Sequence, residues 1–323
     1  MNRFFGSVKG SRPMDFRELQ YIVTVADCRS ITQAARQLYI SQPSLSYALG
    51  QIEKEMGVRL FDRSRQPLEL TDAGRLYVKT ARDILQARLD LKNRLADLKD
   101  GQGAQVRLGI PPERAGYMLP PVINQFRQRF PASEFAIREA NTEELLDLLQ
   151  NNRVAFLICP RDPRKIPAQM TAELIYHESI QLLAGPDAFP EEMFLDRAKK
   201  RVDFQKLARL PFIGIKKRHS IRDKVEAIFR QYDAVPRMLL EVESSSTAAQ
   251  LAACGLGWTL VPRRARKILG PEAEACSYTF SPTPVQWEIN AITKKDAYLN
   301  KAERYFLDLM KETFHRREEA GME

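Results

Sequence analysis

Long apolar runs are missing from this sequence of 323 residues. None of its apolar stretches approaches the roughly 20 residues that a membrane-spanning helix needs. The N-terminus also lacks the apolar core of roughly 7–15 residues that marks a secretory signal peptide. We therefore expect no membrane partner and a protein that works in the cytoplasm.

Metal ligands and reactive thiols are scarce as well. The sequence has 3 histidines and 4 cysteines, and no two cysteines form a Cys-x-x-Cys pair. So small and scattered a set of ligands favours no zinc site. The cysteines lie in apolar stretches, as reduced core residues of cytosolic proteins do, although their spacing leaves a redox-sensing pair open as an alternative. They are Cys28, Cys159, Cys254 and Cys276.

Signatures of common enzyme classes are also absent. The sequence contains no Gly-x-Gly-x-x-Gly fingerprint, no phosphate-binding loop and no Gly-x-Ser-x-Gly elbow. Each of these motifs has a mechanical role in its class, so their absence weakens the alternative of an α/β enzyme with an accessory domain. We predict that the chain is not an enzyme and needs no cofactor.

What the sequence does contain is a basic excess and enough apolar residues for more than one core. Its 50 lysines and arginines exceed its 41 aspartates and glutamates, which gives a formal net charge of +9, and 44% of its residues are hydrophobic. At roughly 100–200 residues per domain, this length predicts about two domains. The basic excess is denser in the smaller N-terminal part and suits a polyanionic partner, without identifying one.

Three short helical patterns follow a lead-in, residues 1–13, that we expect to be disordered. The first helix begins at Asp15, and Ser30 followed by Gln33 makes a capping-box start for the second. Ser41 can cap a third helix that ends at Gly57. Two short helices joined by a tight turn predict a helix-turn-helix.

In a helix-turn-helix, the N-terminal residues of the last helix meet base edges in the major groove of DNA. The exposed candidates here are Gln42, Ser44, Ser46 and Tyr47, because amide and hydroxyl groups can pair with bases or phosphates. Apolar residues flank the basic, turn-forming segment 62–67, which reads as the tip of a two-strand wing. Its two arginines, Arg63 and Arg65, would touch the DNA backbone or minor groove.

These residues carry a resemblance to a known family. The motif residues are Ala34–Ala35, Ser41–Ser46, Glu53, Gly57, Leu60–Phe61, Arg63 and Leu70–Gly74. Together they resemble the DNA-binding signature of LysR-type transcriptional regulators, and the resemblance extends over residues 14–313. It implies a homodimer or homotetramer that binds double-stranded promoter DNA and responds to a small-molecule coinducer or corepressor, with RNA polymerase as a further partner. It adds Ser41 and Pro43 to the candidate DNA contacts. The sequence departs from the family by placing Tyr47, Gly50 and Gln51 where basic residues are common.

A long helix should connect the winged head, residues 14–71, to the rest of the chain. Residues 72–100 contain no proline and place apolar residues on a heptad seam that needs a partner helix. The seam residues are Tyr77, Ala81, Ile84, Arg88, Leu91, Leu95 and Leu98. Such a helix can dimerise two heads, which matches the paired half-sites that these proteins read. A single packed helix is the alternative.

After a flexible linker, Asp100–Gly103, short apolar runs alternate with amphipathic helices, which predicts α/β sheets with parallel strands. The resemblance implies an effector domain over residues 104–313 with two lobes, similar to type 2 periplasmic binding proteins. Lobe I would hold about 104–177 and 280–313, lobe II about 178–279, and a tail would follow at 314–323. The chain would cross between the lobes near Tyr176–Ser179 and Cys276–Pro282.

Ligands of open α/β sheets lie beyond the carboxyl ends of strands, close to helix N-termini. Two loops fit, one at Pro111–Arg114 and one at Ser244–Thr247, and nearby cations would suit an anionic effector. The candidate effector residues are Pro112, Glu113, Arg114, Arg161, Lys216, Ser245, Ser246 and Thr247. A simple helix cap and turn is the alternative for the serine run.

The predicted mechanism is a bistable sensor, in which an effector closes the lobes and the change alters DNA binding through the oligomer. The sequence leaves two further functional hypotheses open. An exported solute-binding protein would need a signal peptide, and a non-specific DNA binder would bind in a salt-sensitive way without a preferred site.

Overall fold

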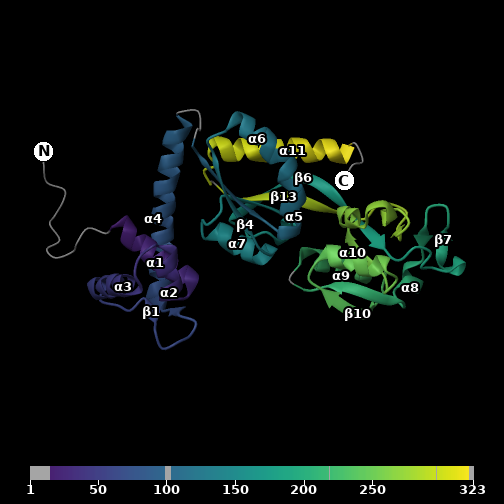
Figure 1. Ribbon diagram of the computed structural model, residues 1–323, viewed down its shortest axis with the longest axis horizontal. Helices are drawn as coiled ribbons and strands as arrows, with labels where there is room; N and C mark the ends of the chain where they lie inside the picture. The colour runs from purple at the N-terminus through teal and green to yellow at the C-terminus, as the bar shows by residue number, and fades with distance from the viewer. Residues whose placement is uncertain (1–14, 99–102, 218, 296, 320–323) are drawn as a thin grey trace. The chain divides into compact units, whose positions relative to one another are not determined.

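The computed structural model describes residues 15–98, 103–217, 219–295 and 297–319 (Figure 1). The chain divides into two compact units, one ending at Leu95 and one starting at Ala96. Each unit has an apolar core of its own. The predicted lead-in and residues 100–102 of the predicted linker lie outside the described residues.

Local sequence signals begin the first two helices of the first unit. α1 (Phe16–Cys28) starts after Asp15, whose carboxylate accepts a hydrogen bond from a backbone N–H of the first turn. α2 (Ile31–Gln37) starts after Ser30, whose hydroxyl accepts a hydrogen bond from the backbone N–H of Gln33. Each cap satisfies a donor that would otherwise lack a partner, which is why these residues mark the helix starts.

The third helix completes the predicted helix-turn-helix. α3 (Gln42–Met56) starts after Ser41, whose hydroxyl accepts from the N–H of Ser44, and ends at Gly57 with a φ of 69°, a left-handed conformation that favours glycine. The helices share a small core with the residues that follow them. Its fully buried members are Ile22, Val25, Ala34, Ala35, Leu45, Leu49, Ile52, Leu60, Phe61 and Val78.

A short antiparallel ribbon forms the predicted wing. β1 (Phe61–Asp62) pairs with β2 (Glu69–Leu70). The carboxylate of Glu53, on α3, accepts hydrogen bonds from the backbone N–H groups of Leu60 at 2.8 Å and Phe61 at 3.2 Å. This carboxylate therefore fixes the start of the wing to the helix that precedes it.

The long helix α4 (Asp72–Asp97) follows the wing. Its first turn lies against the wing: a Cβ atom on Gly74 would stand 1.9 Å from the backbone oxygen of Leu60. Further along, the predicted seam is uncovered, because Leu91 is 59% and Leu95 is 54% exposed. An apolar stripe left open on one chain fits a surface that a second chain covers.

Lobe I of the second unit has three layers. In its sheet, β3 lies between β4 and β5 and is parallel to both, whereas β13 is antiparallel to β5 and β6. α6 and α11 pack on one face of the sheet and α7 on the other (Figure 1). The elements are β3 (Gln105–Ile110), α5 (Pro112–Met118), α6 (Pro120–Arg129), β4 (Glu134–Glu139), α7 (Thr142–Gln150), β5 (Phe156–Pro160), the 3₁₀ turn η1 (Pro163–Lys165) and α11 (Lys301–Glu319).

Two long strands connect the lobes. β6 (Met170–Leu183) pairs with β13 (Gln286–Lys294) through its first ten residues. It then continues into lobe II, where Ile180–Leu183 pair with β11 (Thr259–Pro262). The lobes are therefore joined by a hydrogen-bonded ribbon rather than by two separate loops.

Lobe II encloses an aromatic-rich core between helices and a parallel strand pair, β9 with β10. Phe204, Phe212, Phe229 and Trp258 lie edge to face or tilted against one another in this core. The elements are η2 (Glu191–Met193), β7 (Phe194–Asp196), β8 (Arg201–Val202), α8 (Phe204–Leu207), β9 (Pro211–Ile215), α9 (Ser220–Gln231), β10 (Arg237–Val242), α10 (Ser245–Ala253), η3 (Arg263–Ala273) and β12 (Ser277–Tyr278).

Two expectations for this unit were wrong in detail, and a third is shifted by a few residues. The main sheet is mixed rather than parallel, because β13 returns to it antiparallel. The return crossing lies at the start of β13, several residues after Cys276–Pro282, since Val285 still bonds the lobe II residue Ile180. The expected tail at 314–323 is wrong at its start, because α11 continues to Glu319 and Phe314 is buried on its apolar face.

Candidate functional site

The first candidate site is the exposed N-terminal half of α3. Gln42, Pro43 and Ser44 are exposed there, Tyr47 is 71% exposed, and Ser46 is half-buried. Ser41 and Ser44 are tied to each other by a hydroxyl–hydroxyl contact of 2.7 Å. The amide of Gln42 and the hydroxyl of Tyr47 are thus the predicted groups most available to a partner.

The two wing arginines already have carboxylate partners. Arg63 pairs with Glu53 at 3.0 Å, and Arg65 pairs with Glu69 at 2.9 Å. Arg65 and Glu69 are both substantially exposed, so their ion pair is weak and can exchange for a phosphate contact at little cost, whereas the side chain of Glu53 is only 11% exposed. The structure brings both arginines to the wing, as predicted, and shows that their guanidinium groups are oriented by acidic neighbours.

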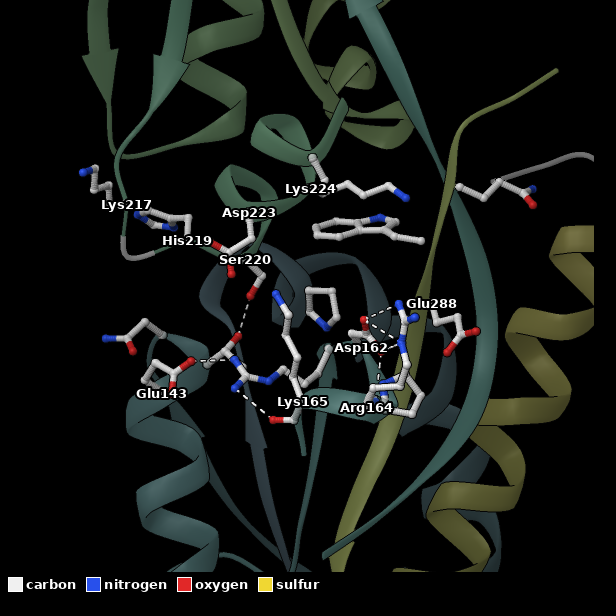
Figure 2. Close-up of a pocket in the computed structure, with 18 residues that line it drawn as sticks. Glu143, Asp162, Arg164, Lys165, Lys217, His219, Ser220, Asp223, Lys224 and Glu288 are labelled. Atoms are coloured by element: carbon white, nitrogen blue, oxygen red, sulfur yellow. Dashed lines mark hydrogen bonds and ion pairs between the residues drawn. The ribbon is translucent and has the colours of Figure 1, made fainter. Parts of the chain in front are cut away.

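The second candidate site is a cavity of about 870 Å³ between the lobes (Figure 2). From lobe I it is lined by the start of α7 and by the segment from Pro160 to Lys165, and from lobe II by residues at the start of α9. At this cavity the hydroxyls of Thr142 and Ser220 lie 2.6 Å apart, so each lobe contributes one side of a hydrogen bond.

Charged groups at this cavity divide into paired and unpaired ones. Arg161 pairs with Glu143 at 2.5 Å, and Arg164 pairs with Asp162 at 2.8 Å. The hydrogen bonds from Arg164 lower the pKa of the Asp162 carboxyl to about 2. Carboxylates therefore already occupy both arginines.

Three lysines, Lys165, Lys217 and Lys224, also line the cavity. Lys165 and Lys224 have no ion pair within the described ranges, and they extend into the cavity from opposite lobes (Figure 2). Burial lowers the pKa of the Lys224 ammonium, because a site with little water disfavours the charged form. An anion between Lys165 and Lys224 would offset the loss of solvation at Lys224 and would also contact the exposed Lys165.

A smaller cavity of about 300 Å³ continues from the first one and shares Thr142, Ser220 and Trp287 with it. The predicted residues Pro112, Glu113, Arg114 and Ser245 line it. Two polar atoms of its lining residues are buried without a hydrogen-bond partner in the described chain, Ser245 Oγ and Arg264 Nη1. A ligand with acceptor atoms would satisfy both.

The N-terminus of α10, predicted to hold an anion, is already satisfied by the protein. The Ser245 N–H donates to Glu113 Oε1 at 2.6 Å. The N–H groups of Ser246 and Thr247 donate to the hydroxyl of Ser244. Glu113 thus supplies, from lobe I, the negative charge that this helix end favours.

Next to the smaller cavity lies a buried charge cluster that joins the lobes. Glu178, on β6, accepts from Arg114 of lobe I at 2.8 Å and from the indole of Trp287 at 3.0 Å. Its other oxygen pairs with Arg264 of lobe II at 3.2 Å. The predicted effector residue Arg114 is only 3% exposed, so its charge is committed to Glu178.

The remaining predicted residues lie outside the cavity linings. Lys216 pairs with Glu243 at 2.6 Å, and neither Ser246 nor Thr247 lines a cavity described above. The sequence did not single out Lys165, Lys224, Glu178 or Arg264, because each stands in an ordinary polar stretch. Only the fold shows that they meet.

The cysteines and the possible metal ligands lie apart from one another in the described part of the chain. It contains no cluster of three or more histidine, cysteine, aspartate or glutamate side chains that could hold a metal ion. None of its cysteines forms a disulfide bond. Cys159 and Cys276 are buried as expected, whereas the expectation of a core position is wrong for Cys254, which is exposed.

Both units of the chain match known protein families. Residues 16–75 match the bacterial regulatory helix-turn-helix proteins of the lysR family, and residues 99–315 match the LysR substrate binding domain. The HTH-type transcriptional regulator BsdA of Bacillus subtilis is 28% identical over 312 residues, which are 92% of this chain and 100% of that protein. A full-length OxyR variant of Pseudomonas aeruginosa superposes with a TM-score of 0.68 at 22% identity, over 94% of this chain and 96% of that one. Full-length CbnR in complex with its target DNA gives a TM-score of 0.63 at 21% identity, over 93% and 100%. At these identities the two structures support the fold alone.

Proposed function

Because the chain belongs to the LysR family of DNA-binding transcription regulators, we propose that α3 reads its promoter and that the interlobe cavity binds its effector. The predicted family, the two-part fold class and the regulatory rather than enzymatic function are confirmed by the two matched domains. The family binds promoter DNA, responds to small molecules and forms oligomers. The proposal extends to contact with RNA polymerase at the promoter and to action in the cytoplasm.

DNA reading rests on the exposed start of α3. Gln42 can pair bidentately with adenine, and Ser46 and Tyr47 can bond to base edges or phosphates. Ser41 and Ser44 stiffen the first turn through their mutual contact, so they orient the helix end toward a phosphate. Arg63 and Arg65 exchange their carboxylate partners for the DNA backbone or minor groove.

A selection of bound duplexes from random DNA, followed by affinities at two salt concentrations, tests this assignment. We expect enrichment of a dyad-symmetric site and a loss of about 1–3 kcal/mol of binding free energy in Gln42→Ala. The matched control is Gln20→Ala, an exposed glutamine on α1. Binding without a preferred site, or an equal loss in both variants, would contradict reading by α3.

Effector binding rests on one observation, the unpaired Lys165 and Lys224 that extend into one cavity from opposite lobes. We assign them to a carboxylate or similar anionic group of the effector. An anion that contacts both ammonium groups binds the closed arrangement better than an open one, and only such a difference in affinity can shift the two-state equilibrium. The carboxylate of Glu113 already accepts a hydrogen bond from the N-terminus of α10. The anion therefore binds at the lysines rather than at this helix end.

A screen of metabolites by thermal shift, repeated on variants, tests the effector site. Stabilising ligands should carry a negative charge, and Lys165→Gln and Lys224→Gln should each weaken them by about tenfold, the loss of one charge-assisted contact. Lys295→Gln removes an exposed lysine elsewhere on lobe I and serves as control. If only neutral or cationic ligands stabilise the protein, the anionic assignment is wrong.

A further inference from the structure

A separate cavity of about 280 Å³ lies in lobe II and shares no lining residue with the interlobe cavities. Three parts of the lobe meet there: the lobe II end of β6 at Ser179–Gln181, the strand β8 with a residue shortly before it, and the start of η3. The segment Tyr278–Val285 supplies the rest of the lining. We call this space the lobe II pocket.

Four cations line the lobe II pocket, and one of them has an acidic partner in the described part of the chain. Lys199, Arg201, Arg263 and Arg266 line it, and none of its described lining residues is an aspartate or glutamate. Arg266 pairs at 3.3 Å with Glu274, which is 84% exposed. The other three side chains have no ion pair in the described part of the chain, and Arg201 Nε is buried without a partner.

Local structure positions three of these cations around the pocket. Arg263 and Arg266 are three residues apart on the 3₁₀ turn η3, so they lie on the same face. Arg201 is held by the backbone of β8, where Val202 N–H donates to Thr279 O at 2.9 Å. Apolar side chains, among them Ile180 and Phe280, supply the remaining wall.

We propose that the lobe II pocket binds a small anion with two negative charges, such as phosphate or the phosphate group of a metabolite. Like charges that line one pocket repel one another when no acid lies among them, and a bound dianion turns this repulsion into attraction. The flat fork of each guanidinium matches the oxygens of a phosphate and forms short, charge-assisted hydrogen bonds. The apolar wall gives a phosphate ester room for an organic group.

A ligand in the lobe II pocket would affect the contacts at the junction of the lobes. Arg264 stands between Arg263 and Arg266 on η3 and pairs with Glu178 in the buried cluster. Ile180, in the apolar wall, donates its N–H to Val285 O in the ribbon that connects the lobes. The bound dianion therefore acts on the same hinge as the effector, from a different site.

Titration calorimetry of the full-length chain at about pH 8, where phosphate is a dianion, tests the proposal directly. Inorganic phosphate is compared with chloride at matched ionic strength. We expect saturable binding of phosphate to the wild type and a loss of about tenfold in Arg263→Gln and in Arg201→Gln. The second variant guards against a folding defect in the first, and thermal midpoints without phosphate identify such a defect.

Two control variants locate the site. Arg209→Gln removes an exposed arginine elsewhere in lobe II, and Lys165→Gln removes a cation of the interlobe cavity. Both should bind phosphate within about twofold of the wild type. Absence of saturable binding, or an equal loss in Arg209→Gln, would overturn the proposal in favour of diffuse charge. A loss confined to Lys165→Gln would place the anion between the lobes and overturn it as well.

Phosphate esters then distinguish the source of the anion. Glycerol phosphate or phenyl phosphate that binds more tightly than inorganic phosphate, and loses this gain in Arg263→Gln, supports a phosphorylated metabolite. Weaker binding of both esters supports the free ion as the ligand of the lobe II pocket.

Discussion

Replacing Glu178 by glutamine should weaken the effector-binding unit more than any exposed charge change. The carboxylate is 2% exposed and is shared by Arg114 at 2.8 Å and Arg264 at 3.2 Å. Glutamine keeps the size of the side chain and can still accept one hydrogen bond. It removes the carboxylate that both contacts share, so two buried guanidinium groups lose their acidic partner.

The size of the effect follows from that burial. Breaking a buried ion pair by removing one partner costs about 3–5 kcal/mol, because an uncompensated charge stays behind. Exposed pairs are worth only about 0–1 kcal/mol. For a unit of this size, a loss of about 3–5 kcal/mol lowers the thermal midpoint by about 10 °C.

Tryptophan fluorescence can report this effect separately from the DNA-binding head. The chain has 2 tryptophans, Trp258 and Trp287, and both belong to the second unit. Urea unfolding followed at their emission therefore measures the effector-binding unit in the full chain. Glu191→Gln is the control, because its carboxylate is 76% exposed and pairs with Arg197 at 3.5 Å.

If Glu178→Gln lowers the free energy of unfolding no more than Glu191→Gln does, the buried ion pairs of Glu178 do not stabilise the unit as expected. Adding Arg264→Gln to Glu178→Gln gives a second check, since it removes one of the two orphaned cations. The double variant should recover at least about 1 kcal/mol of the loss, a coupling typical of groups in one buried network. If the changes in unfolding free energy of the two single substitutions simply add in the double variant, the charges of Glu178 and Arg264 do not compensate each other.

The remaining predictions concern other parts of the chain. Gly74→Ala should lower the midpoint of the head and abolish DNA binding, because its Cβ would meet Leu60 O at 1.9 Å; circular dichroism and a gel-shift assay measure both, and normal binding would contradict it. Leu95→Glu should shift the oligomer to a smaller mass in light scattering, because it charges the open seam of α4, and an unchanged mass would exclude that seam. Burial raises the pKa of the Cys159 thiol to about 12, so a mass spectrum after brief alkylation at neutral pH should show label on exposed Cys254 and none on Cys159; equal labelling of the two would contradict it.

Features with local causes were predictable from the sequence. Ser30, Ser41 and Gly57 begin or end helices through contacts within four residues, so their residue types reveal their roles. The first half of β6 was missed, because Met170–Ser179 lacks a regular alternation of apolar residues. β6 pairs with β13 in lobe I and with β11 in lobe II. The pattern of its buried positions therefore changes along its length.

The candidate sites show the same limit. The loops at Glu113 and Ser245 were predicted from their places after strands, but their hydrogen bond joins residues that are 132 positions apart. Lys165 and Lys224 carry no local signal at all. A surface lysine becomes a binding group only when the fold sets it opposite another, which no spacing in the sequence records.

Three polar contacts in the described part of the chain link residues of the two lobes. They are Thr142 with Ser220, Glu113 with Ser245, and Glu178 with Arg264. An effector can shift the equilibrium only by the difference in its affinity for the closed and open arrangements. Because these contacts already favour the arrangement in which the lobes touch, the effector proposed to bridge the two lysines needs to add only a small difference in affinity. A variant that loses one contact should therefore require a more tightly binding effector for the same response, even though no effector atom touches the changed residue.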